Sequence, residues 1–81
     1  MKNFNYLIND AKAEFRDYST REIDGLVFHY IGCNSTHKFE IAKLGNGVVI
    51  HSYFVSEGIA QEENFRWKED GELSGSYLGH Y

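Results

Sequence analysis

The spacing of the hydrophobic residues changes once along this sequence, and the change narrows the folds that the chain can adopt. Over residues 3–18 the apolar residues recur with the period of an α-helix and cover about one third of the helical wheel. They are Phe4, Leu7, Ile8, Ala11, Phe15 and Tyr18. From Gly25 onward the residues alternate with the two-residue period that is typical of β-strands. We therefore expect one amphipathic helix over residues 3–18, with Tyr6 away from the core, followed by a sheet.

Strand-like segments follow the helix at residues 25–31, 38–43, 48–55, 65–68 and 73–78. These segments are rich in β-branched and aromatic residues, and the first has apolar residues on both faces, as a central strand does. Gly45-Asn46-Gly47 and Asp70-Gly71 contain the residue types that tolerate the positive φ angles of tight hairpin turns. Residues 56–63 are polar and acidic, and we expect a loop there.

The expected elements fit together in a simple way. Antiparallel strands joined by short loops form a meander, and the N-terminal helix is the element available to cover one of its faces. The sequence thus predicts an α+β fold, with an N-terminal amphipathic helix packed on one face of a four- to five-stranded antiparallel meander sheet. No linker, repeat or low-complexity tract divides the chain, so residues 1–81 are expected to form a single domain.

The length of 81 residues limits the stability that a hydrophobic core can provide. A domain of this size buries only roughly 60% of the surface of its unfolded chain, and small domains often add disulfides, a metal ion or a partner subunit. Cys33 is the single cysteine, which excludes an internal disulfide. Six Phe, six Tyr and one Trp supply large apolar areas, either for a dense core or for contacts with a partner.

The sequence carries no pattern typical of export or membrane insertion. Residues 1–5 lack a charged region followed by an apolar run, and no window approaches the roughly 18 apolar residues of a membrane span. One unpaired thiol fits a reducing compartment. We therefore expect a cytoplasmic protein that does not bind membranes.

The negative charge is concentrated in the last third of the chain. Residues 1–55 carry equal numbers of acidic and basic side chains, so the formal charge of −4 arises after them. There, six acidic residues are balanced only by Arg66 and Lys68. A surface for nucleic acids or anionic lipids needs clustered Lys and Arg, which displace counterions from phosphates. The sequence therefore argues against direct binding to DNA, RNA or an anionic membrane.

Candidate chemical sites match known geometries poorly. His29, Cys33 and His37 are spaced four residues apart, and a turn would be needed to bring them near His51, whereas zinc sites have tighter spacing and more cysteines. Cys33 has no acidic or oxyanion-binding motif beside it that would complete a catalytic set with His29 or His51. The glycines around Asn46 lack the following helix of a phosphate loop. We predict no metal site, no cofactor and no catalytic residue.

The acidic last third favours a docking surface. Carboxylates can lie against Lys and Arg of a partner while an aromatic ring inserts as an anchor. The predicted partner-binding residues are Glu57, Glu62, Glu63, Trp67, Glu69, Asp70, Glu72 and Tyr77. In the competing interpretation the carboxylates are solvated surface, and Phe65 and Trp67 close the core at the edge of the sheet.

Two classes of function fit these features. The first is a non-enzymatic protein-binding domain that inhibits or regulates a macromolecular partner; by size and charge, a phage-type inhibitor that occupies the phosphate-binding groove of a host nucleic-acid enzyme or CRISPR complex is one example. The second is a small homodimeric ligand-binding domain or enzyme with a pocket between helix and sheet, lined by His29, Tyr30, His51 and Tyr53. A structural or immunity subunit of an obligate complex is a third class that the sequence leaves open.

Overall fold

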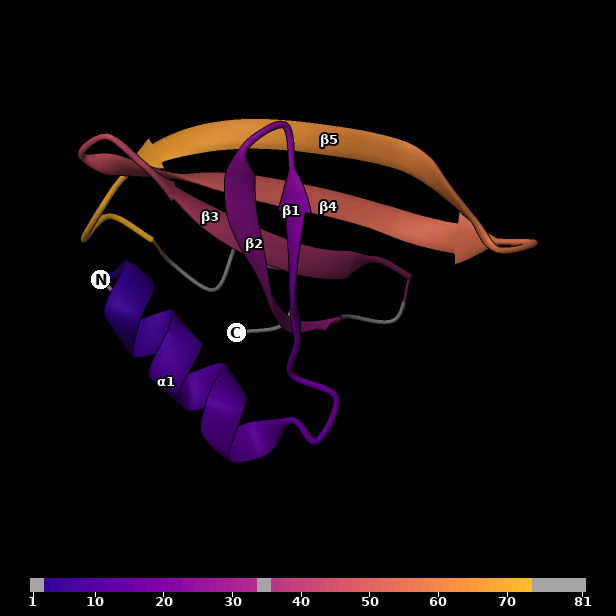
Figure 1. Ribbon diagram of the computed structural model, residues 1–81, viewed down its shortest axis with the longest axis horizontal. Coiled ribbons are helices and arrows are strands. Elements are labelled where there is room, and N and C mark those ends of the chain that lie inside the picture. Colours follow the sequence, from indigo (N-terminus) through magenta and orange to yellow (C-terminus); the bar gives the residue numbers. More distant parts are fainter. Residues whose placement is uncertain (1–2, 34–35, 74–81) are drawn as a thin grey trace.

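The computed structural model describes residues 3–33 and 36–73 as one helix followed by a five-stranded sheet. The elements are α1 (Phe4–Glu14), β1 (Thr20–Ile23), β2 (Leu26–Cys33), β3 (Lys38–Leu44), β4 (Gly47–Ser56) and β5 (Ile59–Glu69). The strands lie in the order β1-β2-β3-β4-β5, and each neighbouring pair is antiparallel. Figure 1 shows α1 against one face of this sheet. The predicted α+β meander fold is therefore confirmed.

The start of α1 is held by two hydrogen bonds from different parts of the chain. The N–H groups of a first helical turn have no partner within the helix. The side chain of Asn3 accepts a hydrogen bond from the Tyr6 N–H at 2.8 Å, which is the usual role of an N-cap residue. The Phe4 N–H donates to Asp70 Oδ1 at 2.7 Å, across 66 positions of sequence. The helix is thus capped both locally and from the end of the sheet.

The helix is shorter than predicted, because it ends at Glu14 and not at residue 18. Phe15 has an extended backbone, although its N–H still donates to Ala11 O at 2.9 Å. Phe15 and Tyr18 nevertheless pack against the core, as their place in the apolar pattern indicates. No glycine or proline lies between Phe15 and Tyr18 to mark the end of the helix in the sequence.

The main core lies between α1 and the sheet. Its buried members on the helix are Leu7, Ile8 and Ala11. On the sheet and after it, they are Ile31, Phe39, Ile41, Val48, Ile50 and Leu73. Tyr6 is 52% exposed, so its predicted position away from the core is also confirmed. The apolar face of the helix and the inward-facing apolar side chains of the strands therefore form one buried layer.

Two strands differ from the sequence-based expectation. β1 was missed; it pairs with β2 across a turn at Asp24-Gly25, where the φ angles are 51° and 82°. The loop expected at residues 56–63 is wrong, because the chain turns sharply at Glu57-Gly58 and continues directly as β5. The hairpin turn at Gly45-Asn46 is confirmed by the pairing of Leu44 with Gly47. The strand expected at 73–78 lies, after Leu73, outside the described residues.

The sheet curls strongly toward the face that α1 does not cover, which we call the open face. The Phe28 and Phe65 rings lie 6.3 Å apart between centroids, although β3 and β4 separate their strands. In a flat sheet, three strand spacings would place such residues about 14 Å apart. Figure 1 shows β1 and β2 crossing in front of β3, β4 and β5. The curl allows side chains on the open face to be buried without a second layer of helices.

Candidate functional site

Four charged or ionisable side chains form a continuous cluster on the open face. The Arg21 Nε donates to Glu40 Oε1 at 2.9 Å. Glu40 Oε2 lies 2.6 Å from His51 Nδ1, and the other ring nitrogen of His51 lies 3.0 Å from Glu63 Oε1. Glu40 is 2% exposed and His51 is fully buried, whereas the side chains of Arg21 and Glu63 are about half exposed. The polar cluster therefore runs from solvent across the buried part of the open face and back to solvent.

His51 joins two carboxylates in this cluster, because each of its ring nitrogens lies within hydrogen-bonding distance of one of them. Glu40 in turn contacts both Arg21 and His51. Removing the Glu40 carboxylate would leave the buried His51 without this partner, and buried polar groups without partners are costly.

Aromatic rings surround His51 and hold its orientation. The Phe65 ring stacks on the imidazole at 4.0 Å between centroids and is tilted by only 5°. The Tyr53 ring lies 4.7 Å away on the same strand, and Phe28 presents its edge at 6.0 Å. The Arg21 guanidinium lies 5.3 Å over the Tyr53 ring, so this aromatic residue contacts both Arg21 and His51.

The register of the β3–β4 hairpin creates the central pair of the cluster. The turn at Gly45-Asn46 places Glu40 directly opposite His51, and the β4–β5 pairing places Phe65 opposite His51. Opposite residues in an antiparallel pair lie on the same face with their side chains in contact. The cluster is therefore a consequence of strand register and needs no irregular loop.

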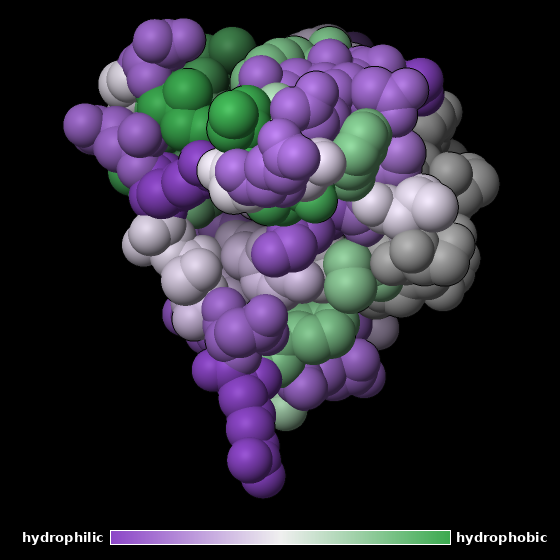
Figure 2. Space-filling view, turned by 90° about the vertical axis from the view of Figure 1, so that its right-hand side faces the viewer, coloured by the Kyte–Doolittle hydropathy of each residue, from purple (hydrophilic) through white to green (hydrophobic). Residues whose placement is uncertain are grey.

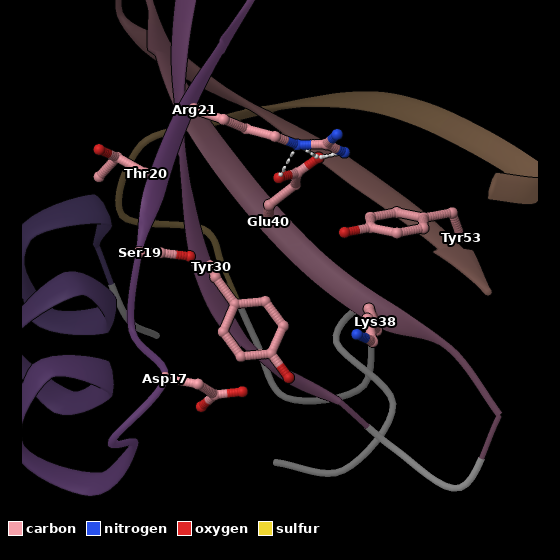
Figure 3. A pocket seen from close by; sticks show the side chains of 8 residues that line it. All are labelled: Asp17, Ser19, Thr20, Arg21, Tyr30, Lys38, Glu40 and Tyr53. Carbon is pink, nitrogen blue, oxygen red and sulfur yellow. Dashed lines mark hydrogen bonds and ion pairs between the residues drawn. The ribbon is translucent and has the colours of Figure 1, made fainter. Parts of the chain in front are cut away.

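A pocket of about 330 Å³ lies beside the polar cluster. Figure 3 shows Arg21 and Glu40 on its wall, with the hydroxyl groups of Tyr30 and Tyr53 directed into the space between them and Lys38. Asp17, Ser19 and Thr20 complete its lining. Tyr30 and Tyr53 were predicted to line a pocket, and they do. The pocket, however, opens on the face away from α1 and not between helix and sheet.

The two phenols of the pocket are held in their neutral form. Burial raises the pKa of Tyr30, and the neighbouring Cys33 adds to the effect. Burial also raises the pKa of Tyr53, together with the negative charge of Glu40. Both hydroxyl groups therefore remain hydrogen-bond donors at neutral pH. Lys38 adds an ammonium group for which the described part of the chain provides no ion pair.

A strip of exposed apolar side chains lies further along the open face, beside the β3–β4 turn. Its members are Leu44, Phe65 and Trp67, which are 46%, 52% and 47% exposed. Phe65 and Trp67 are two residues apart on β5 and therefore point to the same face. Trp67 Nε1 donates to Leu44 O at 3.3 Å, and its ring lies directly over the backbone of Gly47. The competing interpretation, in which Trp67 closes the core, is thus not observed, and its indole remains half accessible. We call these three residues the aromatic strip.

A second group of exposed apolar residues lies at the turn between β4 and β5. Val55 is 47% exposed and Ile59 is 61% exposed. Figure 2 shows this end of the molecule, where hydrophobic side chains gather in the upper part among hydrophilic ones. The two apolar groups occupy opposite ends of the β4–β5 hairpin, which makes them separable by mutation.

The predicted acidic residues do not form one cluster. They are spread along β5 and its two ends. β5 has eleven residues and, as an extended strand, is roughly 33 Å long. Glu57 lies in the β4–β5 turn, Glu62 at a bulge in β5, Glu69 at the end of the strand, and Glu72 after it. Glu63 belongs to the polar cluster. Their role in partner binding stays a prediction.

Asp70 has a structural role that the sequence did not indicate. Its carboxylate accepts from the Phe4 N–H through one oxygen and from Lys43 Nζ at 2.9 Å through the other. Burial acts to raise the pKa of Asp70, but the hydrogen bonds from Phe4 and Lys43 outweigh it and hold this pKa below its usual value. Tyr77, the last predicted docking residue, lies outside the described residues.

The four sequence positions considered as metal ligands or nucleophiles lie apart. His29 points toward α1, where its Nδ1 lies 2.6 Å from the Tyr18 hydroxyl, whereas His51 lies on the open face. Cys33 is exposed at the end of β2, and His37 packs edge-on against Phe54. Within residues 3–33 and 36–73, no three His, Cys, Asp or Glu side chains are placed to hold a metal ion.

Comparisons with known proteins identify no relative. Neither protein-family models, nor curated proteins, nor solved structures gave a match to this chain. In the part of the chain that the structure describes, no helix is both long and apolar enough to cross a membrane.

Arg21, Glu40 and their link to His51 were not among the residues predicted from the sequence. Glu40 stands between Phe39 and Ile41, where the alternation of a strand predicts an outward-facing polar side chain. A usable signal was present, because a two-residue turn at Gly45-Asn46 sets the hairpin register and pairs Glu40 with His51. The contact with Arg21 had no such signal, since it depends on β1 and on the curl of the sheet.

Proposed function

We propose that this chain is a non-enzymatic protein-binding domain that docks on a macromolecular partner through the open face of its sheet, and so inhibits or regulates that partner. The observation that carries the proposal is the half-exposed aromatic strip. Phe65 and Trp67 present large, rigid apolar surfaces on a face that no described element covers. Aromatic residues in this setting are the usual anchors of protein interfaces, because they bury much area with little loss of side-chain entropy.

The charge of the chain indicates the chemistry of the partner. Glu63 and Glu69 lie on the same face of β5 as the aromatic strip, and the net charge of the chain is −4. Such a surface attracts a partner whose docking site is rich in Lys and Arg, and it repels nucleic acids. The groove of a nucleic-acid-binding enzyme or a CRISPR complex is a site of this type, and a phage-type inhibitor is the corresponding role. The exposed thiol of Cys33 supports the cytoplasm as the place of action.

The test compares two exposed aromatic residues on different surfaces. Trp67→Ala removes the anchor from the open face, and Tyr6→Ala removes a ring of similar exposure from the outer face of α1. Both tagged variants and the wild-type protein are used as baits in lysate of the natural host, and bound proteins are quantified by mass spectrometry. We expect one stoichiometric basic partner with the wild-type bait and with Tyr6→Ala, and at least about a tenfold loss with Trp67→Ala.

Two outcomes would contradict the open face as the docking surface. One is equal capture by all three baits. The other is a loss caused by Ile59→Ala but not by Trp67→Ala, which would move the interface to the β4–β5 turn. Circular dichroism of each variant confirms that lost binding does not reflect unfolding. A partner whose binding is unchanged by salt up to about 0.5 M would argue against the role of charge.

A ligand-binding function is the second candidate, and the pocket beside Arg21 is the observation that favours it. Its volume of about 330 Å³ suits a small molecule. Lys38 would meet an anionic group, and the neutral hydroxyls of Tyr30 and Tyr53 would donate to further acceptors. Thermal-shift assays with phosphorylated and carboxylated metabolites test this function. A ligand that stabilises the wild-type protein but not Lys38→Ala would support the ligand-binding function. The absence of any thermal shift would contradict it.

A further inference from the structure

The outer edge of β5 offers unpaired backbone groups in the part of the chain that the structure describes. β5 is the last strand of the sheet and is eleven residues long. The Asp70 N–H donates to Asn46 O, which lies opposite it, so the hydrogen-bonded pairs of this ladder fall on the even-numbered residues of β5. Antiparallel ladders alternate, and the amides of Phe65, Trp67 and Glu69 therefore face outward. This edge can accept another strand.

The charges along β5 have an order that matches a second copy of the same strand. Within β5, Glu62 and Glu63 precede Phe65, whereas Arg66, Lys68 and Glu69 follow it, so the formal charge is −2 before Phe65 and +1 after it. Edge strands usually carry charges that repel further strands. Here, an antiparallel copy reverses the order and brings each acidic half against a basic half. The charge pattern is thus self-complementary in one direction only.

We propose that two copies of this chain associate through their β5 edges, antiparallel and around a two-fold axis at Phe65, and form one continuous ten-stranded sheet. In this register the Phe65 residues of the two copies face each other. Asn64 meets Arg66 of the second copy, and Glu62 lies near Lys68 of the second copy, with each contact made twice. A shift that centres the axis on Arg66 would place Arg66 against itself and Glu63 against Glu69, so charge repulsion disfavours that register.

The bulge in β5 limits how much of the edge takes part. Asn64 pairs with Ser52 and Gln61 with Phe54, so Glu62 and Glu63 stand opposite Tyr53 alone, and Glu62 has a φ of 50°. The extra residue bends the strand at this point. Backbone pairing is therefore centred on the regular segment that begins at Asn64, and Glu62 reaches Lys68 of the second copy through its side chain.

The two-fold axis is perpendicular to the sheet, so the open faces of both copies lie on the same side. The two aromatic strips then meet at the centre of the ten-stranded sheet, and Trp67 of one copy lies opposite Glu63 of the other. This association does not depend on the proposed docking function, because it needs no partner. It would, however, double the docking face.

A charge-swap experiment tests the proposal on the purified full-length protein. Sedimentation velocity is measured from about 1 to 200 μM for the wild type, Lys68→Glu, and Glu62→Lys/Lys68→Glu. We expect a dimer for the wild type. In Lys68→Glu both ion pairs become repulsive, and the dimer dissociation constant rises at least about tenfold. The double variant exchanges the two charges and returns the constant to within about threefold of the wild type. Arg16→Glu, in the turn after α1, makes the same charge change away from β5 and leaves the dimer unchanged.

Three results would overturn the proposal. They are a wild-type monomer at every concentration, a dimer that Lys68→Glu does not weaken, and a double variant that stays as weak as Lys68→Glu. The double variant separates loss of the ion pair from damage to the fold. A single variant that dimerises weakly because its fold is damaged would not be rescued by the second change. Failure of the partner-capture experiment with Trp67→Ala would not affect these outcomes.

Discussion

The two faces of the sheet bury their side chains by different physical means. On the helix side, Leu7 and its neighbours on α1 cover the strands, and the buried layer is apolar. On the open face, the curl of the sheet buries Phe28, and beside it lie the polar partners Glu40 and His51. Apolar burial stabilises a fold directly, whereas a buried ionic cluster adds little net stability and mainly makes an incorrect arrangement costly. The first face therefore supports folding, and the second fixes the shape of the exposed surface.

The largest difference in the free energy of unfolding is expected when a Leu→Ala substitution on the helix side is compared with one on the open face. Leu7→Ala leaves a cavity in a fully buried site and should lower the free energy of unfolding by about 4 kcal/mol. Leu44→Ala removes a side chain that is 46% exposed and should cost less than about 1 kcal/mol. Urea unfolding measures both values. Because Leu7→Ala can unfold so small a domain entirely, Ile41→Val, with an expected loss of about 1 kcal/mol, provides a milder measure of the helix-side core.

The next effect concerns the ionic cluster of the open face. Glu40→Gln keeps the size of the side chain but removes the carboxylate that Arg21 and His51 both contact. We expect a loss of about 3 kcal/mol in urea unfolding, because removing one partner of a buried, hydrogen-bonded pair is strongly destabilising. Glu22→Gln, on the exposed side of β1, should change the stability by less than about 0.5 kcal/mol. Similar losses in the two variants would show that the cluster does not differ from surface charge.

A backbone contact on the open face should give an intermediate effect. A Cβ atom at position 47 would collide with the Trp67 ring and lie 2.6 Å from Lys68 O, so Gly47→Ala must displace the indole or the strand. We expect a loss of about 2 kcal/mol, as for other overpacked sites. Trp67 is the only tryptophan, so its fluorescence reports the displacement directly. An unchanged emission spectrum would mean that Trp67 does not cover Gly47 in solution.

The smallest effect concerns Asp70, on the helix side, and depends on pH. The hydrogen bonds from Phe4 and Lys43 lower the pKa of Asp70 against the opposing effect of burial, so this residue stabilises the fold above its ordinary pKa of 3.8. That contribution is lost as the pH falls through the lowered pKa of the folded state. Asp70→Asn should cost about 1 kcal/mol at pH 7, and its difference from the wild type should shrink in acid. Urea unfolding from pH 7 to 2.5 tests this expectation, which a constant difference would contradict.

The helix-side face was largely predictable from the sequence, because its pattern is local. The stripe that includes Leu7 and Ala11 repeats with the helical period, and the alternation in residues 38–43 places Phe39 and Ile41 inward, as observed. The end of α1 was not predictable, since no breaker follows Glu14. The strand at 59–64 was hidden because Gln, Glu and Asn dominate it.

The open face was less predictable, because its burial depends on contacts that are distant in sequence. β1 is short and mostly exposed, so it has no alternation to detect, although Asp24-Gly25 is a strong hairpin signal that could have revealed it. Glu40 appears solvent-facing in any local pattern. Only the curl that brings Phe28 to Phe65 removes water from it, and local residue patterns do not encode that curl.

The hydrogen bond between Phe4 and Asp70 has a consequence for the order of events during protein synthesis. It joins the first turn of the helix to the turn that follows the last strand, and Leu73, just beyond it, completes the core under the helix. The helix leaves the ribosome before the strands, but neither of these contacts can form until residues 70–73 have emerged. The native packing of the helix is therefore expected to form late and not progressively, and truncation before residue 70 should leave a chain with an incomplete core.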